Sequence, residues 1–164
     1  MNFSDPNVLW IAYSLSNAVA ILLLLAAIRS PKLARLLFAI LFFWASWINY
    51  STSSTTPEVY LEYGEKAVNL YAAFINGWFR QHISEFVKAI AVGQGLIALG
   101  MLLKGIWVRL ACIGAIIFLL AIAPLGLYAA FPFSLIAGAA CFFILKKDDL
   151  NYLWRPRVLF GHKT

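Results

Sequence analysis

The stretch VLWIAYSLSNAVAILLLLAAI, residues 8–28, runs for 21 residues without a charged side chain. Crossing the hydrocarbon core of a bilayer takes about 20 helical residues, so this run is long enough to span a membrane. No basic residue precedes it, and it ends in Arg29-Ser30-Pro31-Lys32, unlike a cleaved signal peptide. We therefore predict that residues 8–28 form a retained transmembrane helix.

Four further apolar runs follow along the chain, at about residues 33–50, 86–103, 108–125 and 129–145. The composition agrees with them, since 63% of the 164 residues are hydrophobic and only 12% are charged. A soluble domain carries about twice that share of charged residues. We predict an all-α polytopic membrane bundle of about five transmembrane helices, forming a single membrane domain over residues 1–164 with a tail at 146–164.

The basic residues are distributed unevenly between the loops on the two sides of this bundle. Ten lie on one side, and three lie on the other together with most of the acidic residues. The positive-inside rule makes the basic side cytoplasmic, so we predict an outer N-terminus and a cytoplasmic C-terminus. The net charge of +6 does not indicate nucleic-acid binding, because these residues share no single face. The cytoplasmic set is Arg29, Lys32, Arg35, Lys104, Arg109, Lys146, Lys147, Arg155, Arg157 and Lys163, and the outer set is Lys66, Arg80 and Lys88.

The longest connection between the apolar runs has a helical pattern of its own. Thr56-Pro57-Glu58 is typical of a helix start, and apolar residues then recur every three or four positions up to Trp78. We predict an amphipathic helix over about 57–79 that lies along the outer interface or caps the bundle. A second outer connection, near Pro124 and Gly126, carries no charge, and we expect it either to be covered by this segment or to lie shallowly in lipid.

Small residues spaced by four positions indicate where helices pack closely in lipid. Four such pairs occur, which predicts a tightly packed bundle. They are Ala89 with Gly93, Ala91 with Gly95, Ala111 with Ala115, and Ser134 with Gly138.

Polar and aromatic residues gather towards the outer half of the bundle, between the capping segment and the helices at 33–50 and 86–103. We predict a ligand site there for a flat apolar molecule such as a quinone ring. The same residues also suit an interfacial belt, an ion pair between Glu85 and Lys88, and amides that tie helices together. The candidate residues are Trp47, Asn49, His82, Glu85, Lys88 and Gln94.

The sequence contains no catalytic motif and no clustered metal or haem ligands, so we predict no metal site and no catalytic residue. Cys112 and Cys141 lie within apolar runs and form no Cys-x-x-Cys motif. We expect both to be buried small residues.

The stretch Val92-Gly93-Gln94-Gly95-Leu96-Ile97-Ala98-Leu99-Gly100-Met101-Leu102-Leu103, followed by a short basic turn ending at Arg109, resembles the DoxX-like family of small bacterial membrane proteins. The segment from Pro57 to His82 is similar to a loop of some members, and the resemblance covers about residues 33–146. It implies a four-helix core, to which residues 1–31 add a helix. Many members carry a glutamate near the start of the Gly-rich helix, whereas Glu85 stands eight positions before Gly93.

The resemblance implies a place in the bacterial cytoplasmic (inner) membrane and a link to quinone or redox metabolism. Some relatives are membrane subunits of a thiosulfate-to-quinone oxidoreductase, and others accompany the maturation of periplasmic redox enzymes. Our leading hypothesis is a non-catalytic membrane subunit or accessory protein with a membrane or periplasmic protein partner. The alternatives are a stand-alone binder of a lipid or quinone, and an enzyme acting on such a molecule at the outer leaflet.

Overall fold

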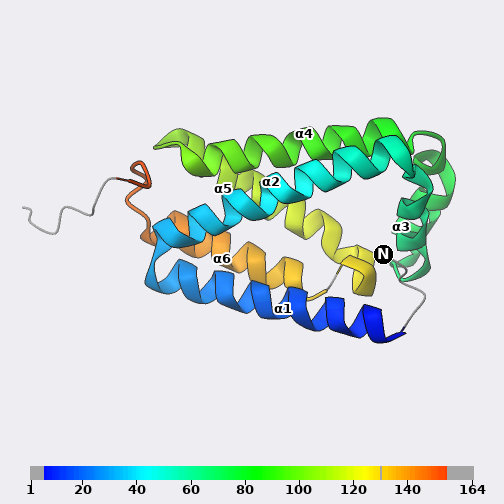
Figure 1. Cartoon of the computed structure of the whole chain (residues 1–164), viewed down its shortest axis with the longest axis horizontal. Helices are drawn as coiled ribbons and strands as arrows, with labels where there is room; N and C mark the ends of the chain where they lie inside the picture. Colours follow the sequence, from blue (N-terminus) through cyan, green and yellow to red (C-terminus); the bar gives the residue numbers. More distant parts are fainter. Residues whose placement is uncertain (1–5, 130, 155–164) are drawn as a thin grey trace, which may run out of the picture.

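The computed structural model describes residues 6–129 and 131–154, and residues 6–9 through their backbone only (Figure 1). Asp5, Arg155, Arg157 and Lys163, together with the rest of the predicted tail beyond Trp154, lie outside this part. The described chain is helical and contains no β-strand. Its elements are α1 (Pro6–Arg29), α2 (Pro31–Thr55), η1 (Pro57–Glu65), α3 (Asn69–Phe74), η2 (Ile75–Phe79), α4 (Ile83–Leu102), α5 (Ile106–Ile122), η3 (Ala123–Ala129) and α6 (Phe133–Lys147).

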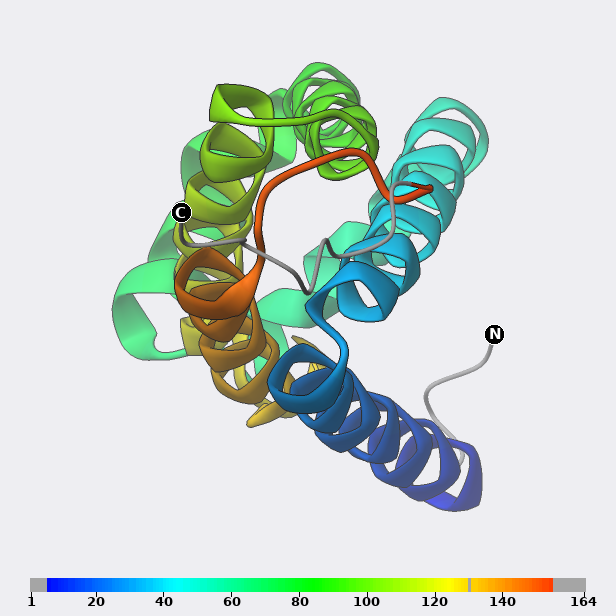
Figure 2. The same ribbon diagram turned by 90° about the vertical axis from the view of Figure 1, so that its left-hand side faces the viewer.

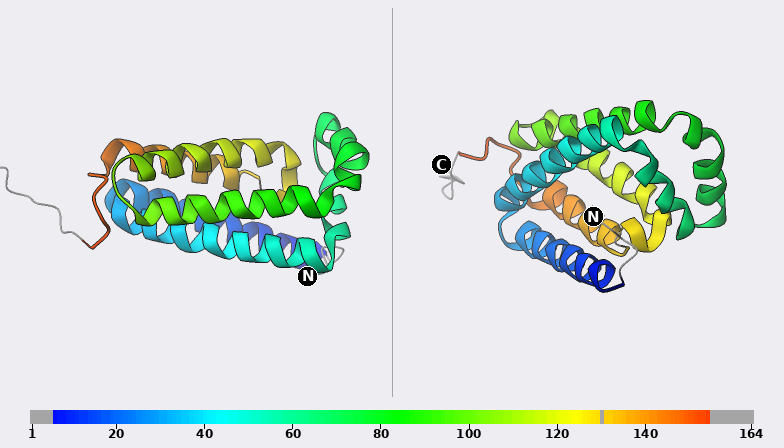
Figure 3. Two further views of the ribbon diagram at one scale, coloured as in Figure 1. Left: turned by 90° about the horizontal axis from the view of Figure 1, so that it is seen from above. Right: turned by 45° about the vertical axis from the view of Figure 1, so that its right-hand side comes forward.

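The five long helices lie side by side around a common core. Each packs on its neighbours in the order α1, α2, α4, α5, α6, and α6 returns to α1 (Figure 2). One end of the bundle holds the α1–α2 and α4–α5 connections and the segment 148–154 (Figure 1). We call it the basic end, because it carries all the described residues of the predicted cytoplasmic set. The segment between α2 and α4 lies across the opposite end (Figure 3).

Among the described residues, four helices are long and apolar enough to cross a membrane, namely Trp10–Arg29, Pro31–Thr55, Ile83–Leu102 and Ile106–Ala129. The predicted all-helical fold is therefore confirmed, with several helices long and apolar enough to span a membrane. The predicted fifth span corresponds to α6, which has 15 residues. At 1.5 Å per residue it is about 22 Å long, shorter than a hydrocarbon core of about 30 Å.

Close helix contacts occur at two of the four predicted small-residue pairs, Ala91 with Gly95 and Ala111 with Ala115. A Cβ on Gly95 would lie 3.2 Å from the Ser46 Oγ of α2, and Ala91 beside it is buried. Ala111 and Ala115 are buried, and a Cβ on Gly100 would lie 2.7 Å from the Ala111 Cβ. Ser134 and Gly138 are buried too, but no atom lies within 4 Å of a Cβ built on Gly138, so this pair shows no close contact. The prediction for Ala89 and Gly93 was wrong, because Ala89 is exposed and no atom lies within 4 Å of a Cβ built on Gly93.

The predicted single helix over 57–79 was also wrong. The chain forms a 3₁₀-helix at Pro57–Glu65, a short α-helix at Asn69–Phe74 and a π-helical turn at Ile75–Phe79. Gly77 marks a kink inside the last of these pieces, and Gly64 packs against the same piece. Gly64 lies so close to Ile75 that an added Cβ would be 3.3 Å from its side chain, and Gly77 has non-helical angles of φ −95° and ψ −111°.

The segment 57–82, which we call the outer cap, covers the other connection at this end. The Val68 backbone N–H donates to the Pro124 carbonyl at 3.0 Å, and the Tyr128 hydroxyl donates to the Glu65 carboxylate at 3.3 Å. Gly126 has a φ of +71°, and a Cβ there would lie 2.5 Å from the Lys66 carbonyl oxygen. Of the two expected arrangements of the uncharged turn, coverage by the outer cap is therefore confirmed.

Candidate functional site

Two of the predicted site residues meet beneath the outer cap. The Asn49 amide of α2 donates to the Gln94 side-chain oxygen of α4 at 2.8 Å, and Gln94 is only 4% exposed. The Tyr60 hydroxyl of η1 donates to the Asn49 side-chain oxygen at 2.9 Å. A chain of neutral polar groups thus leads from the outer cap to the buried face of α4.

Tyr60 is the member of this chain that sequence reasoning missed as a site residue. Burial raises the pKa of its phenol to about 12, and the neighbouring Tyr63 adds to the rise. Tyr60 is therefore a neutral donor at physiological pH. Its place in an aromatic-rich segment was visible in the sequence, but the fold of the outer cap decides which aromatic residue reaches Asn49.

Two serine bonds support the same helix pair. The Ser46 hydroxyl donates to the Ala91 carbonyl at 2.7 Å, and the Ser84 hydroxyl donates to the Ser53 carbonyl at 2.7 Å. Together with the pair of amides, they join α2 and α4 at three levels. Bonds of this kind between membrane helices each contribute roughly 1 kcal/mol.

The other four predicted residues do not converge on this chain. Trp47 of α2 is 67% exposed. His82 stacks on the Trp78 ring, with the centroids 4.4 Å apart, and its Nδ1 lies 3.0 Å from the Trp78 carbonyl oxygen. Glu85 is exposed, and no ion pair joins it to Lys88. Lys88 is half-buried, and no hydrogen bond joins these four residues to Asn49 or Gln94 in the described part of the chain.

A small groove of about 160 Å³ lies where α2 contacts α4. Three aromatic side chains of α2 line it, and the bond between Ser46 and Ala91 crosses the same contact. It is smaller than the 300 Å³ or more of a typical enclosed ligand pocket, so it suits a single ring rather than a whole large molecule. The lining residues are Phe43, Ser46, Trp47, Tyr50, Ala91 and Val92.

The most extensive polar network lies near the basic end and is centred on Arg35, whose side chain is 0% exposed. Its Nε donates to the Met101 carbonyl at 3.0 Å, and its Nη2 donates to the Leu103 carbonyl at 2.6 Å. Its Nη1 donates to the Asn151 carbonyl at 2.7 Å and to the Asp148 carboxylate at 3.1 Å. One guanidinium therefore fastens α2 to the end of α4 and to the segment after α6.

This network corrects the placement of Arg35 in a cytoplasmic loop. Helix α2 begins at Pro31, directly after the single residue Ser30, so Arg35 already lies in its second turn. The burial of Arg35 could have been predicted from helical spacing. Arg35 lies three positions before Phe38 and seven before Phe42, and therefore on the same buried face. Asp148 and Asp149 are the only acidic residues on that side of the predicted topology.

Groups suited to metal binding do not cluster in the described part of the chain, where no three His, Cys, Asp or Glu residues come together. Cys112 and Cys141 are both buried free thiols, as expected. The Cys112 Sγ lies 3.9 Å from the Met101 Sδ.

Comparison of the chain with protein-family models, curated proteins and solved structures finds no match. The resemblance to the DoxX-like family therefore stays a prediction from the residues that carry it.

Proposed function

We propose that the chain is a non-catalytic integral membrane protein of the bacterial cytoplasmic membrane, acting as a subunit or accessory protein linked to quinone or redox metabolism. One observation carries the proposal. Three polar side chains buried between the helices bond to other parts of the bundle, namely Arg35, Asn49 and Gln94. Such groups build a stable scaffold, and the outward surfaces are left to make contacts with partners.

The proposal includes a topology of five spans with an outer N-terminus and a cytoplasmic C-terminus. The separation of charge between the two ends of the bundle supports it. Helix α6 is short, so it crosses only with local thinning of the bilayer. A C-terminal alkaline-phosphatase fusion should be inactive while a C-terminal fluorescent-protein fusion is bright. An active phosphatase fusion would overturn the proposed topology.

Co-purification tests the proposed role. The full-length chain, extracted in a mild detergent from bacterial membranes, should carry one protein partner in fixed stoichiometry, and chemical cross-links should map to its outward surfaces. A chain that elutes alone and turns over an added lipid or quinone would contradict a non-catalytic role. A lone chain that retains a quinone without turnover would favour the second candidate function.

That second candidate is binding of a flat apolar ligand such as a quinone, and the aromatic groove between α2 and α4 favours it. Trp47 lines the groove, whereas Trp44 is 60% exposed and does not. Trp47→Ala should reduce quinone retention about fivefold through the lost ring contact, while Trp44→Ala serves as the matched control. Equal retention by the two variants would argue against the groove.

A further inference from the structure

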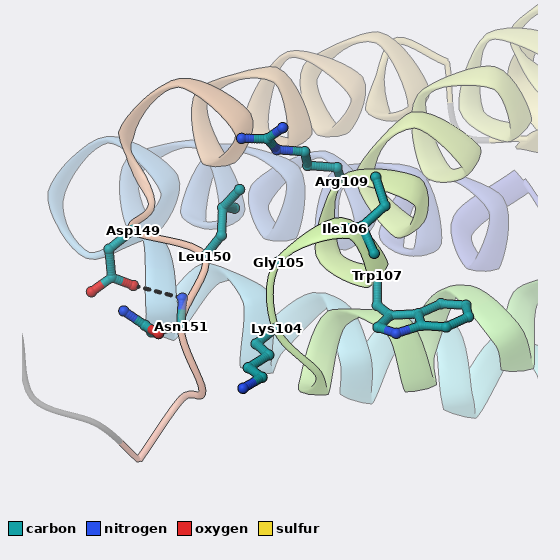
Figure 4. Close-up of a pocket in the computed structure, with 8 residues that line it drawn as sticks. All are labelled: Lys104, Gly105, Ile106, Trp107, Arg109, Asp149, Leu150 and Asn151. Atoms are coloured by element: carbon teal, nitrogen blue, oxygen red, sulfur yellow. Dashed lines mark hydrogen bonds between the residues drawn. The ribbon is translucent and has the colours of Figure 1, made fainter.

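A second pocket, of about 490 Å³, opens at the basic end of the bundle (Figure 4). The loop between α4 and α5, with the first turn of α5, forms one wall, and the segment after α6 forms the other. The Gly105 backbone N–H donates to the Leu150 carbonyl at 2.7 Å, which fixes the two walls to each other. The lining residues are Lys104, Gly105, Ile106, Trp107, Arg109, Asp149, Leu150 and Asn151.

The pocket carries an excess of positive charge. Lys104 and Arg109 are exposed, and neither forms an ion pair with a described residue. The Asp149 carboxylate lies 3.2 Å from the Lys32 Nζ, so its negative charge is matched. Helix α5 also begins here without a side-chain cap, which adds a partial positive charge to the two cations.

Tryptophan side chains indicate the depth at which the pocket lies. Trp107 in its lining is 57% exposed, and Trp154 on the neighbouring segment is 72% exposed. The amphipathic indole ring favours the boundary between hydrocarbon and headgroups. In a bilayer, these two residues place the mouth of the pocket at headgroup level.

An apolar track leads away from the pocket along α5. Ile106, Leu110, Ile113 and Ile117 are all exposed, between 46% and 63%, and follow one another at helical spacing. This stripe starts at the pocket and runs along the face of the helix that the bundle leaves uncovered. These apolar side chains can contact the acyl chains of a lipid, whereas a free phosphate ion has no apolar part to contact them.

We propose that this pocket binds the phosphate of an anionic phospholipid, with Lys104 and Arg109 contacting the phosphate and the α5 stripe contacting the acyl chains. The inference rests on insertion of the bundle in a membrane, and it is independent of any partner or quinone. Basic pockets between membrane helices on the cytoplasmic side are suited to such headgroups. The bound lipid would fill the gap between the α4–α5 loop and the C-terminal segment.

Lipid binding to the purified full-length chain, measured by native mass spectrometry in detergent, tests the proposal. Phosphatidylglycerol should bind more tightly than phosphatidylcholine. Lys104→Gln/Arg109→Gln should weaken phosphatidylglycerol binding about 30-fold, the loss expected for two basic side chains at an anionic headgroup. Lys66→Gln/Arg80→Gln removes the same charge from exposed positions at the opposite end and should leave binding unchanged.

Three results would overturn the proposal. They are equal binding of the two lipids by the parent chain, equal losses in the two double variants, and displacement of phosphatidylglycerol by an equal concentration of inorganic phosphate. The last would assign the pocket to a free phosphate instead of a lipid. The topology fusions stay informative in each case, because they do not depend on this pocket.

Discussion

The buried Arg35 network leads to a quantitative prediction for the stability of the bundle. Arg35→Met removes four donated hydrogen bonds, leaves three backbone carbonyls without this donor, and leaves Asp148 as an uncompensated buried charge. Breaking a buried ion pair from one side costs about 3–5 kcal/mol. We expect the free energy of unfolding to fall by that amount.

Asp148→Asn should cost less, about 2–3 kcal/mol, because Arg35 keeps its three carbonyl acceptors and loses only one charge-assisted bond. The double variant should lose less free energy of unfolding than the sum of the two single variants. Replacing Asp148 removes the unpaired carboxylate charge that Arg35→Met alone leaves buried. Lys32→Met is the matched control. It breaks the more exposed pair with Asp149 on the same two segments and should cost no more than about 1 kcal/mol.

Unfolding in mixed micelles, followed by tryptophan fluorescence as the fraction of denaturing detergent rises, measures these differences. A loss below about 1 kcal/mol for Arg35→Met would refute the reasoning, because the network would then add nothing beyond an exposed pair. Equal losses for Arg35→Met and Asp148→Asn would show that the ion pair, and not the three carbonyl bonds, supplies the stabilisation.

Three further predictions concern other parts of the bundle. Gly100→Ala should destabilise the bundle by about 1–3 kcal/mol, because the new Cβ would lie 2.7 Å from a side-chain atom of α5. Gly93→Ala is the control, since no atom lies within 4 Å of its new Cβ, and it should be neutral or stabilising in the same unfolding assay. Cys112 and Cys141 are both 0% exposed, so a maleimide should label neither until the chain is denatured, and rapid labelling of the native protein would contradict their burial. Burial raises the pKa of Tyr60 to about 12, above its ordinary value near 10. The stabilisation that depends on the neutral phenol is therefore complete below pH 10 and is lost as the pH rises to about 12. Tyr60→Phe should flatten this part of the pH profile, and parallel profiles for variant and parent would argue against it.

The positions of the long helices could be predicted because a bilayer imposes a length on apolar runs. Among the helix starts, prediction and structure differ most for the last run, expected to begin at 129 and found to begin at Phe133. Pro132 explains the later start, since it stands at the N-cap of α6 after a turn.

The outer cap could not be predicted in detail, because its fold depends on contacts between residues distant in sequence. A period of three to four residues is the same whether a segment forms one helix or three short pieces. Gly64 packs on Ile75 and Gly126 packs on the Lys66 carbonyl, and neither contact leaves a mark in local periodicity. The meeting of Asn49 and Gln94 was foreseen only as a shared region of the bundle.

In the membrane topology proposed above, depth in the bilayer explains why the two buried networks differ in charge. Arg35 stands four residues after the start of α2, about 6 Å along the helix axis, where headgroups and water are close. Gln94 stands eleven residues into α4, about 16 Å from its start and near the middle of a hydrocarbon core of about 30 Å. A charge there would be far more costly than a neutral amide. The network at Gln94 is accordingly built from the amides of Asn49 and Gln94 and the phenol of Tyr60. The same reasoning applies to ligands, because a molecule bound beside Gln94 must be neutral and largely apolar, whereas the pocket at the basic end can hold an anion whose charge stays near water.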